Sequence, residues 1–459
     1  MTETPEPGEI DLDNITLTGS LRAVGDHLRA VTGPATGDLS RRAADALLRS
    51  YLEPGCFPDA VRRLSMRHLL VLVGEEETGR RLGGLALLSR MSLAESTITV
   101  LSPAADARDL LSGTEYEPGR AYLLHDWIAV STDRTELVNL ARKLAELGSY
   151  LVVTRNGAPS EAVEVEHPWA APDPGELYDL CLRTSGRRAG LSQEELTRGR
   201  DLALSLPTPA EVVRLSARVA QGGEPGAEEV AAWFDTKPPM REVLAVAALA
   251  FTHRAAEDDY DEQLARLERL LSHETLRRPL RCPLVVVEGG LVGFRDARRR
   301  GQVLAELAAR YGFWLWQPVR EWVRSLPGQG PASQVRAAAG LALLARHAFK
   351  EVQQEFLEVW ARGSAAERVA AANVLSYMCA DDTLAPEALG LALGWAADPG
   401  DVRATTAAVA LGGGLAVRYP GDCARLLRRL VSAGGPAAAV AEQSLALLPG
   451  DPQGRRPKP

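Results

Sequence analysis

The sequence predicts a multidomain protein of the α/β plus α class, in which a parallel-sheet domain precedes helical domains. Short apolar runs alternate with helical patterns between about residues 66 and 172, as in a parallel sheet covered by helices. Beyond Pro172 the patterns become almost entirely helical, and from about residue 331 an Ala-rich pattern recurs. We therefore expect a sheet domain first and packed helices after it.

The two ends of the chain and the region before the sheet are predicted separately. Residues 1–15 and 449–459 are rich in Pro, Gly and charge and lack apolar periodicity, so both are expected to be disordered. Between residues 16 and 65 apolar positions such as Ala43 and Leu47 recur at helical spacing. This spacing predicts a short helical prelude to the sheet.

Five strands are predicted within residues 66–172. Several are continuously apolar, which is the pattern of strands covered on both faces of a parallel sheet. Helices are expected between them at 81–90 and 134–147. The five strands are residues 68–73, 96–101, 121–125, 149–154 and 162–166.

Residues 173–273 are predicted to form a helical domain, because Pro and Gly punctuate a series of helical patterns there. A strand-like stretch then interrupts the helices at 283–294, where Gly289-Gly290 predicts the turn of a hairpin, and a helix at 297–310 follows. The helical patterns are residues 174–184, 192–204, 208–220, 227–234, 239–253 and 258–272.

An internal repeat occupies residues 331–448. The Ala-rich pattern recurs at steps of 33 to 38 residues, and Trp360 and Trp395 hold matching positions in two successive copies. Small Ala side chains let paired helices approach closely, and stacked helical hairpins bury a continuous core. The repeat therefore predicts a HEAT-like α-solenoid. Its copies are residues 335–341, 368–375, 402–409 and 438–445.

The bulk composition fits a globular protein with more than one core. The chain has 459 residues, of which 46% are hydrophobic and 24% charged, and its formal net charge is -8. A prior of about 150 residues per domain gives two to four domains. The acidic balance disfavours a protein that coats nucleic acid or anionic lipid over its whole surface.

The cysteines and the first residues favour a cytoplasmic protein. The five cysteines are far apart and form no pair with metal-ligand spacing, so we expect reduced, buried thiols. The N-terminus is acidic and polar, unlike a signal peptide, and no run of about 18 apolar residues follows. We therefore expect a cytoplasmic location and no membrane partner.

A degenerate phosphate-binding loop joins the first predicted strand to a helix. A working P-loop has the pattern G-x-x-x-x-G-K-[ST], whose lysine neutralises phosphates and whose hydroxyl holds Mg²⁺. Gly74 and Gly79 have the required spacing, but Arg80 replaces the lysine and Arg81 the hydroxyl residue. Thr78 and three glutamates lie between the glycines, and the carboxylates would repel phosphate. Retained nucleotide binding and a relic loop both stay open.

Asp126 closes the third predicted strand, where a Walker B acid would hold Mg²⁺ through water. Trp127 follows it, so the catalytic glutamate that usually polarises the attacking water is missing. An Asp at a strand end is also common as a cap or turn residue. Asp126 is the candidate metal ligand, and Mg²⁺ binding stays open.

Thr154 and Arg155 end the next predicted strand, at the edge where ligands of open α/β sheets bind. In a P-loop topology this strand lies beside the strand that precedes the loop. Either side chain is then placed to sense a γ-phosphate. A solvated Arg155 with no ligand is the alternative interpretation.

The order of these motifs, followed by Leu206-Pro207 in the helical region, resembles the STAND class of signal-transduction NTPases, which includes NACHT and apoptotic-ATPase relatives. The resemblance covers about residues 50–325. It implies that residues 173–273 form a lid whose Pro207 packs on the nucleotide base. It also implies that residues 274–330 form a winged helix before a repeat array that acts as a sensor.

The resemblance assigns the candidate nucleotide site, with ATP or ADP as ligand and Asp126 as the metal residue. The departures from the motif predict a pseudo-NTPase or a very weak ATPase, and no catalytic residue is assigned. We expect a conformational switch whose output passes through an unidentified protein partner of the repeats or through self-assembly. The site residues are Gly74, Thr78, Gly79, Arg80, Arg81, Asp126, Thr154, Arg155 and Pro207.

Two other functions stay open: a nucleotide-independent interaction scaffold, and a DNA-binding regulator that uses the winged helix. DNA is the less favoured partner, because arginines on a helix usually form a solvated face. The aromatic run 313–316, together with Trp322, is expected in the core or in a seam between domains. The basic cluster of the winged helix is Arg277, Arg278, Arg281, Arg295, Arg298, Arg299 and Arg300.

Overall fold

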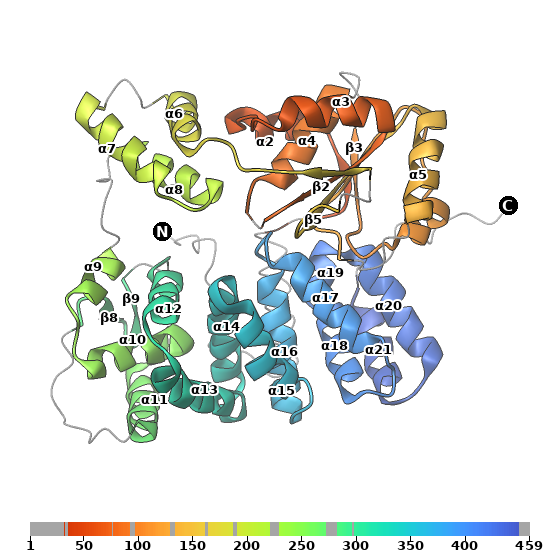
Figure 1. The fold of residues 1–459 in the computed structure, drawn as a ribbon. Helices are drawn as coiled ribbons and strands as arrows, with labels where there is room; N and C mark the ends of the chain where they lie inside the picture. The colour runs from red at the N-terminus through yellow and green to blue at the C-terminus, as the bar shows by residue number, and fades with distance from the viewer. Residues whose placement is uncertain are drawn as a thin grey trace, which may run out of the picture. The chain divides into compact units, whose positions relative to one another are not determined.

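The computed structural model divides into two compact units, which are described separately (Figure 1). The sheet unit comprises residues 35–226. The helical unit comprises residues 227–459 and is grouped with residues 1–34. The residues that the structure describes are 32, 35–75, 77–91, 97–128, 134–160, 164–186, 191–220, 229–271, 282–295 and 298–448. The expected disordered ends and residues 16–31, 33 and 34 of the helical prelude lie outside them.

The sheet unit is built on a six-stranded mixed sheet with the order β1-β3-β4-β5-β2-β6. All neighbouring strands are parallel except β1 and β3, which are antiparallel. The strand that ends in Thr154-Arg155 therefore lies beside the strand that precedes the glycine loop, as expected. The strands are β1 (Gly37–Leu39), β2 (Leu69–Gly74), β3 (Ile98–Leu101), β4 (Ala121–Leu124), β5 (Tyr150–Asn156) and β6 (Glu166–Pro168).

Both faces of the sheet are buried under helices, which explains the unbroken apolar runs of the central strands. Leu70 and Leu72 of β2 pack with α2 (Arg41–Leu47), α3 (Phe57–Arg67) and α4 (Arg80–Met91). The alternate residues of the same strand pack on the opposite face with α5 (Arg134–Leu147) and the short helix η2 (Asp109–Gly113). The period of two along each strand sends successive side chains to opposite cores.

Three helices complete the sheet unit and share a core of their own, with Leu177, Tyr178 and Leu215 at its centre. Gly199 permits close packing there, because a Cβ atom at this position would lie 2.1 Å from the Tyr178 hydroxyl oxygen. The helices are α6 (Pro174–Thr184), α7 (Gln193–Leu204) and α8 (Pro209–Ala220). The boundary between the units falls after residue 226, inside the range expected for one lid domain.

The helical unit begins with helices around a three-stranded sheet of order β7-β9-β8. The predicted hairpin is confirmed, with Gly289 (φ 60°) and Gly290 (φ 80°) at its turn. The third strand of this small sheet, β7, precedes residue 274, so the sheet extends beyond the range expected for the winged helix. The elements are α9 (Glu229–Asp235), α10 (Met240–Thr252), β7 (Ala255–Ala256), α11 (Glu257–Leu270), β8 (Val285–Glu288), β9 (Leu291–Phe294), α12 (Arg298–Arg310), α13 (Phe313–Ser325) and η4 (Leu326–Gln329).

The four repeat copies lie in four helices that pack on one another in succession: α14 (Pro331–Val352), α16 (Ala365–Met378), α18 (Val402–Gly412) and α21 (Pro436–Leu447) (Figure 1). Their alanines are mostly buried, as expected for closely spaced helices. The helices between the copies are η5 (Gln353–Leu357), α15 (Glu358–Trp360), α17 (Ala385–Ala396), α19 (Leu415–Arg418) and α20 (Pro420–Ala433).

Three local features differ from the sequence expectations. The antiparallel strand β1 lies where only helix was expected, and β6 begins at Glu166 rather than four residues earlier. Residues 162 and 163 of that predicted strand lie outside the described residues. The aromatic run also divides, because Trp322 is buried whereas Phe313 and Trp314 are 71% and 53% exposed. In the part of the chain that the structure describes, no helix has the length and apolar content needed to cross a membrane.

Candidate functional site

The loop between β2 and α4 makes a tight strand-to-helix turn that depends on its two glycines. A Cβ atom at Gly74 would lie 2.5 Å from the carbonyl oxygen of Trp169, which excludes other residues. Gly79 has φ 81°, a left-handed conformation that glycine adopts at little cost. Glu77 also has a left-handed φ of 56°, and the Thr78 hydroxyl donates to the Glu75 carbonyl oxygen (2.9 Å). Thr78 therefore stabilises the turn.

Arg80, the first residue of α4, does not extend into open solvent. Its side chain is buried (6% exposed), and its guanidinium group donates to the Arg155 carbonyl oxygen and to the Asn156 side-chain oxygen. These acceptors lie at the carboxyl end of β5, beside β2. Arg80 therefore ties the first turn of α4 to the sheet edge, and Arg81, the next residue, is half-buried.

Asp126 and Thr154 are brought together at the ends of neighbouring strands. The Asp126 backbone N–H donates to the Thr154 hydroxyl oxygen (2.8 Å), which in turn donates to the Asp126 carboxylate (3.3 Å). The Trp127 backbone N–H donates to the Thr154 carbonyl oxygen (2.8 Å). Asp126 has φ 47°, so the chain bends sharply where β4 ends. Thr154 is fully buried and holds this bend.

Arg155 forms an ion pair within the sheet. Its guanidinium Nη2 lies 2.7 Å from Oε1 of Glu166, which is only 6% exposed. The second carboxylate oxygen of Glu166 accepts from the Ser160 backbone N–H (2.6 Å). Val73 is paired with Arg155 and Val71 with Glu166, so this ion pair spans β2. Glu166 is not among the site residues predicted from the sequence, although an acid inside an apolar strand is a signal that a cation pairs with it.

Pro207 lies exposed in the turn before α8, and its neighbour Leu206 packs into the core of α6–α8. Leu206, and not Pro207, is therefore the residue of this turn that packs against the hydrophobic core. The base-contacting role that the resemblance implies for Pro207 stays a prediction.

Trp169 is a second residue that sequence analysis missed. It follows β6, its backbone N–H donates to the Val73 carbonyl oxygen (2.8 Å), and its indole covers Gly83. A Cβ atom at Gly83 would lie 2.1 Å from the indole ring. Glycine lowers helix propensity by about 1 kcal/mol relative to alanine, so the pair Gly83-Gly84 inside a helix indicates close packing. Trp169 therefore packs against both β2 and α4, the two elements that the glycine loop joins.

The charges around the loop are unfavourable for a magnesium-bound triphosphate. Glu75 and Glu77 are exposed, whereas Glu76 lies outside the described residues. Two unit charges about 4 Å apart interact by roughly 4 kcal/mol at an effective dielectric constant of 20, so an acid facing a phosphate offsets much of a cation's attraction. Among the described residues, no group of three His, Cys, Asp or Glu side chains is placed to hold a metal ion.

The basic cluster on which the alternative of DNA binding depends contains a buried residue. Arg300 is 9% exposed, and its guanidinium group donates to the carbonyl oxygens of Ala250 and Arg336 (2.7 Å each). Burial lowers the pKa of Arg300 to about 10. Arg300 therefore connects α12 to α10 and α14 within the helical unit. Residues 277, 278 and 281 lie outside the described residues.

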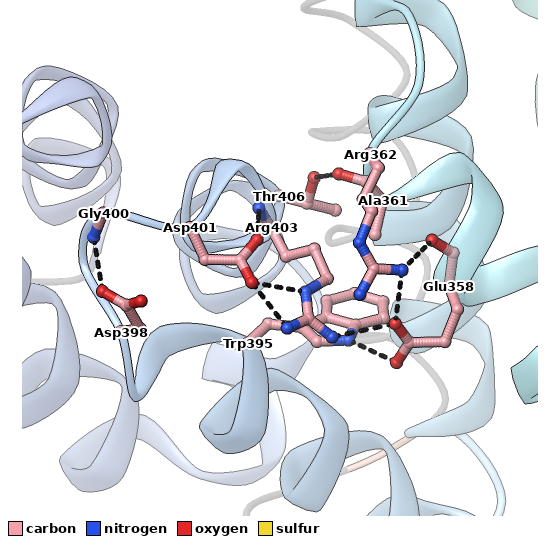
Figure 2. A network of polar contacts seen from close by, with 9 residues as sticks. All are labelled: Glu358, Ala361, Arg362, Trp395, Asp398, Gly400, Asp401, Arg403 and Thr406. Atoms are coloured by element: carbon pink, nitrogen blue, oxygen red, sulfur yellow. Dashed lines mark hydrogen bonds and ion pairs between the residues drawn. The ribbon is translucent and has the colours of Figure 1, made fainter.

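A polar network joins two successive repeats (Figure 2). The Glu358 carboxylate accepts from the Trp395 indole N–H (3.0 Å) and from Arg403 Nη1 (2.9 Å). Arg362 Nη1 lies 3.0 Å from the same carboxylate. Arg403 also donates to Asp401, and these hydrogen bonds lower the pKa of Asp401 to about 2. Glu358 therefore fixes α15 against α17 and α18.

Two comparisons with known proteins find no match to this chain. No protein-family model matches the chain. A search of the curated proteins also finds no match to it.

Proposed function

We propose that this protein is a STAND-like regulatory protein whose P-loop-type domain no longer hydrolyses nucleoside triphosphate and serves as part of a protein-interaction scaffold. In this proposal residues 229–330 contain the winged-helix-like module, and the repeats of residues 331–448 form the HEAT-like array that binds a protein partner. The order of the modules along the chain supports this reading, as does the position of β5 between β2 and β4.

The position of Arg80 is the observation that carries the proposal. A phosphate-binding cation must be free to reach the ligand, but the Arg80 guanidinium group is buried on the Arg155 carbonyl oxygen and the Asn156 amide. Hydrogen bonds to charged groups contribute about 1.5–3 kcal/mol each, so freeing Arg80 would be costly. Arg81 supplies no hydroxyl for Mg²⁺. Asp126 is already hydrogen-bonded to Thr154.

The test is a titration of the full chain with ATP and with ADP, each with and without Mg²⁺, followed by thermal unfolding and by phosphate release. A ligand that binds only the native state raises its stability by mass action. We expect no rise in the midpoint temperature at about millimolar nucleotide, with or without Mg²⁺, and no phosphate release. Mg²⁺-dependent stabilisation with turnover would overturn the proposal.

A matched variant sharpens this test. Arg80→Lys combined with Arg81→Thr restores the complete G-x-x-x-x-G-K-T pattern without altering the glycines. If the lost side chains alone prevent binding, the double variant gains Mg²⁺-dependent stabilisation by ATP that the natural chain lacks. If the glutamates also prevent it, binding appears only when positions 75–77 are changed to serine as well.

A nucleotide-regulated switch is the second candidate. The pairing of Asp126 with Thr154 at the ends of adjacent strands favours it, because this polar pair lies at the edge where ligands of such sheets bind. This candidate predicts that ADP or ATP stabilises the natural chain equally with and without Mg²⁺, and that no hydrolysis follows. The same titration therefore separates the two.

A further inference from the structure

A cavity of about 300 Å³ lies inside the helical unit, in the group of elements formed by α11, η4 and the first turns of α14. Ligand pockets of proteins usually begin at about this volume. The residues that line it are polar or charged except Ala255. A polar solute therefore fits this cavity better than an apolar one.

One wall of the cavity is a polar face of α11. Asp259, Glu262, Gln263 and Arg266 are spaced by three and four residues, which places them on the same side of the helix. Glu262 is paired with Arg266 (2.6 Å). The Asp259 carboxylate makes no hydrogen bond or ion pair with the residues that the structure describes. This wall thus offers an unused negative charge.

The lining residues that come from α14 carry groups that suit a carboxylate. Ser333 and Arg336 line the cavity from the first two turns of this helix. Arg336 is buried (8% exposed) and is fixed by donation to the Arg254 carbonyl oxygen (3.0 Å). A hydroxyl and a guanidinium are the donors that proteins use to bind carboxylates.

Gln263, one of the lining residues, is held in place by neighbouring side chains. Gln263 is 7% exposed, and its amide nitrogen donates to the side-chain oxygen of Gln329 (2.6 Å). Its amide oxygen accepts from the Trp322 indole N–H (3.1 Å). Both ends of the amide are therefore held by neighbours, so this side chain is preorganised and a ligand does not have to order it.

The charges of the lining residues restrict the class of ligand. A nucleotide is too large, and its phosphates would meet Asp259 and Glu262. A bare cation would meet Arg266 and Arg336. We propose that the cavity binds a small zwitterion of the α-amino acid class, with its ammonium group at Asp259 and its carboxylate at Ser333 and Arg336. This site is independent of the glycine loop, and a bound ligand would connect α11 to α14.

The test is isothermal titration of the full chain with the L-amino acids, each at up to about 20 mM, since a small polar ligand in a preformed polar site binds at micromolar to millimolar concentration. We expect saturable binding of at least one amino acid. Its N-acetyl form lacks the ammonium charge and its amide form lacks the carboxylate, so both are expected to bind at least tenfold more weakly.

Two variants of α11 make the test specific. Asp259→Asn removes the unused charge, and we expect at least a tenfold loss of affinity with an unchanged midpoint temperature of the free protein. Asp258→Asn changes an exposed neighbour that does not line the cavity, and affinity should be unchanged. The proposal is overturned if no amino acid binds, if Asp259→Asn binds as tightly as the natural chain, or if the blocked forms bind equally well.

Discussion

Arg80 occupies the place of a phosphate-binding lysine, yet its charge is used inside the protein. The guanidinium fork reaches two acceptors on β5 through two nitrogens, whereas a lysine ammonium group carries its three donors on one nitrogen and lacks this fork. We predict that Arg80→Lys lowers the free energy of unfolding of the sheet unit by about 1–3 kcal/mol, because one buried acceptor loses its donor. Denaturant unfolding of the full chain measures this.

The matched control for Arg80 is Arg198→Lys. Arg198 forms an exposed ion pair with Glu194 one turn away on α7, so the same replacement should change stability by less than about 0.5 kcal/mol. Equal effects of the two replacements would contradict the role given to Arg80. A stabilising effect of Arg80→Lys would contradict it more strongly, since it would mean that the guanidinium is strained.

His253 is the residue whose titration matters most for the helical unit. Burial, followed by the charges of Arg300, Arg254 and Arg336, lowers its pKa to about 3. The ordinary pKa is 6.5, so between about pH 6.5 and pH 3 the unfolded chain binds the proton and the folded protein does not. Stability is therefore lost as the pH falls through this window, at up to about 1.4 kcal/mol per pH unit.

The His253 contribution is isolated by comparison with His253→Gln, which keeps a side-chain acceptor for the Phe294 backbone N–H. We expect the natural chain to lose more stability than the variant between pH 6.5 and pH 4, measured by denaturant unfolding. Parallel pH profiles for the two proteins would show that His253 does not carry this dependence.

The sequence predicts backbone context better than side-chain direction at the candidate site. The spacing of Gly74 and Gly79 and the end of β5 at Thr154 depend on local patterns, and the structure has the expected turn and strand order there. The direction of Arg80 and the pairing of Arg155 with Glu166 depend on residues that are distant in the chain. A local pattern contains no information about such partners.

At the scale of elements, long periodic segments were predicted closely and short ones were not. Helix α6 and helix α5 have the predicted bounds, because caps and apolar spacing determine them within one segment. Strand β1 has only three residues, too few to show alternation, and it forms by pairing with β3. Strand β7 has two residues and depends on β9 in the same way.

Glu358 connects the helices of two successive repeats. Its carboxylate receives hydrogen bonds from Trp395 and Arg403 of the next repeat, and its side chain is 24% exposed. We predict that Glu358→Ala lowers the free energy of unfolding of the helical unit by about 2 kcal/mol, because an indole N–H and a guanidinium lose their acceptor. Tryptophan fluorescence during denaturation reports it.

Glu351→Ala is the control for Glu358, because Glu351 is exposed near the C-terminal end of α14. It should change stability by less than about 0.5 kcal/mol. In a double-mutant cycle, the double variant should lose less stability than the sum of Glu358→Ala and Arg403→Ala, since each single substitution already removes the Glu358–Arg403 interaction. Additive effects of the two substitutions would show that they do not share one network.

At the scale of the whole molecule, the two units have separate hydrophobic cores. The sheet unit has one core on each face of its sheet and a third among α6, α7 and α8, all within residues 35–226. The helical unit buries the repeat alanines together with Trp322, Trp360 and Trp395. Units with their own cores unfold as separate cooperative transitions unless a large apolar interface couples them.

We therefore predict two transitions in scanning calorimetry of the full chain, and the residue-scale variants assign them. Arg80→Lys should lower the midpoint of one transition and leave the other unchanged, because Arg80 contacts residues of the sheet unit. Glu358→Ala should lower only the other transition. A single transition that both variants lower would mean that the two units unfold together. This outcome would favour the switch over the scaffold, because a switch requires the state of one unit to determine the state of the other.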